Sequence, residues 1–121
     1  MDYGSYSLVN SKLADGVKYK VAKMSFGRRI ELTRRIRELG ARREFLEAGD
    51  SPGDKMDAAL LASEIDRLYL MWGLQEIQGL ELDGQPATPE SLIESGPEDL
   101  FREALAAIKQ ECGLSEAERK N

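Results

Sequence analysis

The stretch from Asp54 to Trp72 constrains the fold of this chain more than any other. Its apolar residues recur every three or four positions, which places one set on a single face of an α-helix: Ala58, Leu61, Ile65, Leu68 and Trp72. A second apolar set lies on roughly the opposite side of the same helix: Met56, Leu60, Leu70 and Met71. A helix that is apolar on two sides is either central in the fold or shared with a partner. We therefore expect the second set to bind a partner protein or another copy of the chain, and Trp72 to anchor the core.

A second long helix is predicted just before this one. Ser25 is a typical N-cap, and the helix is expected to run from about Phe26 to Ala48 and to end at Gly49. Its main apolar stripe is Leu32, Ile36, Leu39 and Leu46, and a weaker apolar group lies on its far side: Ile30, Ala41 and Phe45. Because Ser51-Pro52-Gly53 forms only a short break, we expect the two helices to form an antiparallel hairpin.

The remaining segments predict a small β element and shorter helices. Residues 1–16 read as a flexible lead-in, and Val17–Lys23 alternates like a half-buried strand that would pair with Leu74–Leu82. Thr88-Pro89 and Gly96-Pro97 are helix starts, the second helix ending at Gly113, and one more turn is expected near Ser115–Glu118. The expected fold is mainly α within the α+β class: an antiparallel helical hairpin, a two-stranded β element and shorter C-terminal helices. Residues 17–121 would form a single domain.

Composition narrows the classes of function. The chain has 121 residues, of which 41 % are hydrophobic and 32 % charged, as in a globular protein, and no apolar run is long enough for a membrane span. One cysteine, Cys112, excludes an internal disulfide and favours a cytoplasmic setting. The chain contains no histidine, which removes the commonest general base and most zinc sites.

The acidic residues form no specific catalytic or metal-binding constellation. Asp54 and Asp57 fit the first turn of a helix, and Asp83-Gly84 fits a tight turn. No window has the oxygen-ligand spacing of a calcium loop, and Gly79–Gly84 lacks the pattern of a phosphate-binding loop. We therefore expect no cofactor, no metal and no enzymatic activity.

The net charge of −5 hides an uneven distribution. Residues 1–50 hold 11 Lys and Arg against 7 Asp and Glu, whereas residues 51–121 hold 6 against 15. The Arg-rich helix suggests an alternative function, nucleic-acid binding through Arg28, Arg34, Arg35, Arg37 and Arg42. The competing interpretation pairs these arginines with glutamates four residues away along the helix. No aromatic residues interleave with them as a base-stacking platform requires.

The order of features resembles the small tail assembly chaperones of long-tailed bacteriophages. A Lys-containing strand leads into Met24-Ser25-Phe26 and a charged helix, and a second helix ends in Trp72-Gly73-Leu74. The hairpin Gly79–Gly84 follows, then Pro97-Glu98-Asp99-Leu100 and the closing Leu114–Asn121. The resemblance covers residues 17–121. It implies a non-enzymatic protein of the host cytoplasm that holds the tape-measure protein soluble during tail assembly, and it assigns no functional residue.

Overall fold

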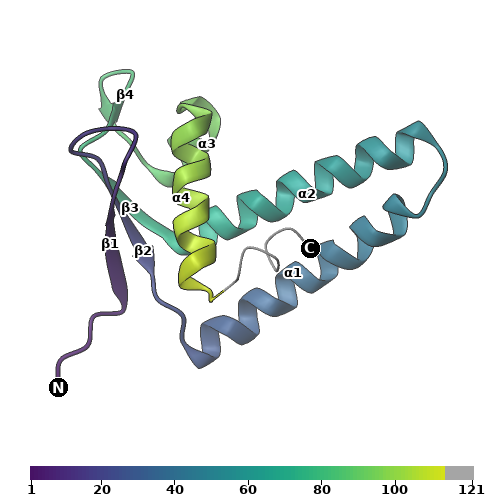
Figure 1. Cartoon of the computed structure of the whole chain (residues 1–121), viewed down its shortest axis with the longest axis horizontal. Helices are drawn as coiled ribbons and strands as arrows, with labels where there is room; N and C mark the ends of the chain where they lie inside the picture. The colour runs from purple at the N-terminus through teal and green to yellow at the C-terminus, as the bar shows by residue number, and fades with distance from the viewer. Residues whose placement is uncertain (114–121) are drawn as a thin grey trace. The chain divides into compact units, whose positions relative to one another are not determined.

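A computed structural model describes residues 1–113 and has the expected mainly helical α+β fold (Figure 1). Its elements, in chain order, are β1 (Tyr6–Asn10), β2 (Lys18–Ala22), α1 (Phe26–Glu47), α2 (Pro52–Gly73), β3 (Leu74–Gln78), β4 (Glu81–Leu82), β5 (Gln85–Pro86), α3 (Pro89–Ser95) and α4 (Glu98–Glu111). The predicted turn near residues 115–118 lies outside the described residues. The described residues divide into two compact units: the first comprises residues 1–24 and 69–113, and the second comprises Ser25–Leu68.

The first unit contains the sheet, α3, α4 and the last turn of α2. The predicted pairing is confirmed, because β2 and β3 are antiparallel, with Tyr19 opposite Ile77. The prediction of a flexible lead-in over residues 1–16 was wrong. Residues Tyr6–Asn10 form a third strand, β1, along the other side of β2. β3 also ends earlier than predicted. Gly79 turns the chain with a positive φ, close to the carbonyl oxygen of Gly16, and a separate β4–β5 hairpin follows around Asp83-Gly84.

The core of this unit lies between the sheet and the C-terminal helices. α4 packs against β2, and α3 packs against both α4 and β3. The largest fully buried side chains are Tyr19, Val21, Leu70, Leu92 and Ile108. Trp72, the predicted core anchor, is part-buried and is not among these fully buried side chains. At the end of α2 the close contact is made instead by Gly73, where an added Cβ would lie 2.4 Å from Cγ2 of Ile108.

The second unit is the helical hairpin of α1 and the first four turns of α2. Ser25 caps α1, its side chain accepting a hydrogen bond from the backbone N–H of Arg28, as expected. α2 begins earlier than predicted, because Ser51 accepts from the N–H of Asp54 and Pro52 occupies the first helical position. Lys55 Nζ donates to the carbonyl oxygen of Glu47, which ties the start of α2 to the end of α1. The candidate site described next is a groove between the two helices of this hairpin.

Candidate protein-binding surface

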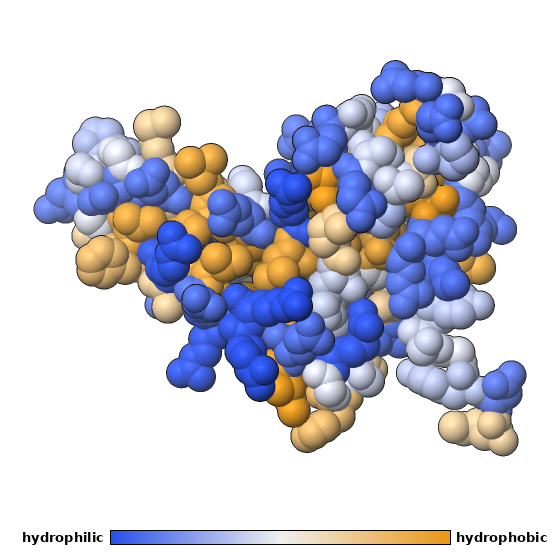
Figure 2. Space-filling view, turned by 180° about the vertical axis from the view of Figure 1, so that it is seen from behind, coloured by the Kyte–Doolittle hydropathy of each residue, from blue (hydrophilic) through white to orange (hydrophobic). Residues whose placement is uncertain are grey.

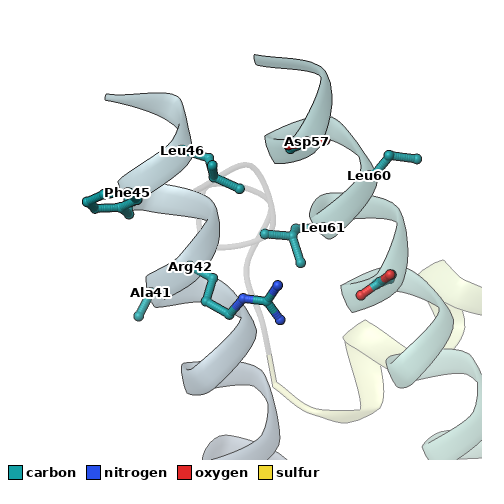
Figure 3. Close-up of a pocket in the computed structure, with 8 residues that line it drawn as sticks. Ala41, Arg42, Phe45, Leu46, Asp57, Leu60 and Leu61 are labelled. Carbon is teal, nitrogen blue, oxygen red and sulfur yellow. The ribbon is translucent and has the colours of Figure 1, made fainter. Parts of the chain in front are cut away.

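A groove of about 590 Å³ lies between α1 and α2 near the closed end of the hairpin (Figure 3). Leu46 and Leu61 point into the space between the helices, and Phe45 and Leu60 flank it on the outer sides. The lining residues are Ala41, Arg42, Phe45 and Leu46 from α1, and Asp57, Leu60, Leu61 and Glu64 from α2. A groove with an apolar floor between two helices is a common docking site for a third helix.

Large apolar side chains remain exposed around this groove. Phe45 is 80 % exposed, Leu60 is 62 % exposed, and Met56, one turn before Leu60, is 69 % exposed. Figure 2 shows hydrophobic residues, in orange, gathered among hydrophilic ones, in blue, on the hairpin at the left of that view. Exposed apolar side chains gathered around a groove are typical of a protein-binding surface.

The groove carries charges of opposite sign on its two walls. Arg42 stands on the α1 side and reaches into the gap, while Asp57 and Glu64 stand on the α2 side. Within residues 1–113, none of these three side chains takes part in a hydrogen bond or an ion pair. Because the charges are not neutralised by each other, they are available to a partner.

The predicted partner-binding residues divide into exposed and buried ones. Met56 and Leu60 are exposed on the hairpin, and Met71 is 39 % exposed on the last turn of α2. Leu70 is 0 % exposed, so its assignment to a binding surface was wrong. It lies in the turn of α2 that belongs to the sheet-containing unit, where it is one of the largest fully buried side chains.

The arginines of the alternative nucleic-acid site differ in their exposure and in whether they form ion pairs. Arg35 pairs with Glu31 at 3.0 Å, as the competing interpretation expected, and Arg28 is only part-exposed and has an interaction partner. Arg34, Arg37 and Arg42 are exposed, and in the described part of the chain they form no ion pair. Arg42 is part of the groove, whereas Arg34 and Arg37 line a separate hollow on the surface of α1 with Ile30.

A polar cluster connected by several hydrogen bonds lies in the other unit, around Glu103 of α4. Its carboxylate accepts hydrogen bonds from Ser11 Oγ (2.6 Å), the Tyr19 hydroxyl (2.8 Å) and the backbone N–H of Lys12 (2.8 Å). Burial raises the pKa of the Tyr19 hydroxyl, and its hydrogen bond to Glu103 raises it further. Burial also raises the pKa of Glu103, but these three hydrogen bonds outweigh it, so the net shift is downward. The cluster joins the β1–β2 turn to α4. Because its polar groups hydrogen-bond to one another, we interpret it as a structural feature of this unit.

Sequence reasoning found parts of the groove but not its composition. Phe45 and Ala41 were placed together on the far side of α1, and Leu60 on the second face of α2. In the structure Arg42 lies across the groove from Asp57 and Glu64. This placement depends on how the two helices are aligned, which helical spacing within each of them does not reveal.

The remaining observations and comparisons add no further site. Cys112 is buried, and residues 1–113 contain no group of three His, Cys, Asp or Glu placed to hold a metal ion. None of the described helices is long and apolar enough to cross a membrane. No protein-family model, curated protein or solved structure matches this chain.

Proposed function

We propose that this protein is a non-enzymatic binding protein of the cytoplasm, and specifically a bacteriophage tail assembly chaperone that binds the tape-measure protein. The observation that carries the proposal is the exposure of Phe45, Met56 and Leu60 around an apolar groove in a helical hairpin. A tape-measure protein is long and helical, and amphipathic helices bind in grooves of this kind through residues spaced three and four apart. The order of sequence features is the second support, because it resembles that family over residues 17–121.

The proposal is tested by co-expression with the tape-measure protein of the same genome. We expect that protein to stay in the soluble fraction with the native chain and to precipitate with the double variant Met56→Ser/Leu60→Ser. Leu13→Ser is the matched control, because Leu13 is also an exposed leucine, 60 % exposed, but lies in the β1–β2 turn. Equal solubility with and without the chain would overturn the proposal, and so would a genome that encodes no tail proteins.

A second candidate is nucleic-acid binding, favoured by the exposed arginines that form no ion pair in the described part of α1. Arg34 and Arg37 would contact phosphates, and each neutralised phosphate contributes a slope of about −0.9 to log K against log salt for duplex DNA. Labelled duplex and single-stranded DNA titrated at about 50 mM salt would show micromolar binding that Arg34→Glu/Arg37→Glu abolishes. Absence of binding by the native chain would eliminate this candidate.

A further inference from the structure

The groove of the hairpin has one property that a general binding surface does not need: its two walls are complementary to each other in charge. α1 contributes Arg42 and α2 contributes Asp57 and Glu64, and in the described part of the chain these groups form no pair. The flanking side chains Phe45 and Leu60 are likewise exposed, one from each helix. We propose that two copies of this chain bind each other groove to groove, so that α1 of each copy lies over α2 of the other.

The arrangement follows from the symmetry of a pair of identical chains. Two grooves can face each other with the two-fold axis either parallel to the helices or across them. The axis across the helices would place α1 over α1, bringing Arg42 of one copy toward Arg42 of the other. The axis parallel to the helices places α1 over α2 at the same level along the hairpin. Arg42 of each copy then meets Asp57 and Glu64 of the other, so the contact occurs twice in the dimer, and this is the arrangement that the charges favour.

The apolar residues provide the attraction in this pairing. Four helices brought together in this way form a four-helix bundle, whose core would include the part-buried Leu46 and the already buried Leu61 from the floor of each groove. Phe45 and Leu60 would be covered at its edges. Covering these exposed aromatic and aliphatic side chains supplies the apolar attraction, and the charges fix which helix meets which.

This pairing goes beyond the proposed chaperone function and does not depend on it. It requires no partner protein, so its measurement succeeds or fails independently of the tape-measure experiment. If both hold, the pair covers Leu60 in the free protein, and the tape-measure protein competes with the second copy for the same groove.

Sedimentation equilibrium of the full chain, combined with charge exchange, tests the proposal. We expect the native chain to form dimers. Arg42→Glu makes both walls acidic, and Asp57→Arg/Glu64→Arg makes both walls basic, so each variant alone should dimerise at least about tenfold more weakly, because like charges then face each other. A mixture of the two variants should form a heterodimer, since every acidic wall then faces a basic one.

The heterodimer separates this proposal from simple loss of folding, because unfolded or damaged chains would not recover on mixing. Arg37→Glu is the matched control, since Arg37 is an exposed arginine on α1 outside the groove, and it should leave the dimer unchanged. The proposal is overturned by a native chain that is monomeric up to its solubility limit, or by two variants that fail to associate when mixed. A dimer that Arg37→Glu weakens as much as Arg42→Glu would also overturn it.

Discussion

Glu103 is the residue whose protonation should control acid stability. Its pKa is lower in the folded chain than the ordinary value of 4.5, because the hydrogen bonds from Ser11, Lys12 and Tyr19 outweigh the effect of burial. A lowered pKa means that folding favours the carboxylate. The resulting contribution is complete above the ordinary value and is lost as the pH falls below it through the folded pKa.

The first prediction is therefore that urea midpoints of the native chain fall between about pH 5 and pH 3, and that Glu103→Gln makes this fall shallower. Glu81→Gln is the control, since it changes an exposed glutamate on β4 of the same unit. Identical pH profiles for the native chain and Glu103→Gln would show that the carboxylate contributes no such stability.

Tyr19 should contribute through its hydroxyl as well as its ring. The ring is fully buried, and the hydroxyl donates to the Glu103 carboxylate at 2.8 Å. Tyr19→Phe keeps the ring and should lower the free energy of unfolding by about 1.5 to 3 kcal/mol, the usual range for a hydrogen bond to a charged group. In a double-mutant cycle with Glu103→Gln the two losses should be less than additive. Strict additivity would mean that the hydroxyl and the carboxylate do not stabilise the fold together.

Leu70 and Leu60 provide a direct test of which side of α2 is buried. Leu70→Ala removes a fully buried side chain and should cost about 2 to 5 kcal/mol, whereas Leu60→Ala removes an exposed one and should stay within about 0.5 kcal/mol. Equilibrium urea denaturation measures both. Similar costs for the two variants would return Leu70 to the surface assigned from the sequence.

At the scale of the elements, the end of α2 depends on the absence of a side chain at Gly73. An added Cβ would lie 2.4 Å from Cγ2 of Ile108, a residue of α4 that is itself fully buried. Gly73→Ala should therefore destabilise the fold by about 1 to 3 kcal/mol through overpacking. Gly40→Ala in α1 is the matched control, since its Cβ would meet nothing within 4 Å and alanine favours a helix by about 1 kcal/mol over glycine. If Gly73→Ala is tolerated as well as Gly40→Ala, the contact with Ile108 is looser than the structure has it.

The elements also show where prediction from the sequence succeeds. The starts of α1 and α3 follow local signals, Ser25 as a cap and Thr88-Pro89 as a cap and first position, so they were predicted closely. β1 was missed because its large apolar residues Tyr6 and Leu8 are exposed, and its strand conformation depends on pairing with β2. Pairing across the chain is a non-local property that alternation in a short segment does not reveal.

The candidate site shows the same limit of sequence-based prediction: patterns within one segment do not reveal contacts with distant segments. Helical spacing identified Met56 and Leu60 as exposed, since both lie away from the main stripe of α2. It failed for Leu70, because the last turn of α2 belongs to a different unit from the rest of the helix. The hydrogen bond between Tyr19 and Glu103 joins residues 84 positions apart, a separation at which no sequence spacing is informative.

At the scale of the whole molecule, the two units differ in how much apolar surface they bury. Seventeen apolar residues are buried in the part of the chain that the structure describes, and only Leu32, Ala58 and Leu61 of these belong to residues 25–68. Segments with few buried contacts open more readily than a well-packed core. We therefore predict that amides of α1 and the first four turns of α2 exchange with solvent faster than those of β2 and α4, which hydrogen exchange with mass spectrometry measures directly.

Pairing between copies adds a concentration dependence to this prediction. If the hairpin opens only in the free monomer, its exchange should slow as the dimer fills, because the monomer fraction falls roughly as the inverse square root of concentration well above the dissociation constant. A hundredfold increase in concentration should then slow exchange in residues 25–68 by about tenfold and leave β2 and α4 unchanged. Arg42→Glu should remove the dependence, whereas Arg37→Glu should retain it. Exchange that is independent of concentration in the native chain would mean that the groove stays open to solvent in the free protein, available to a partner without competition from a second copy.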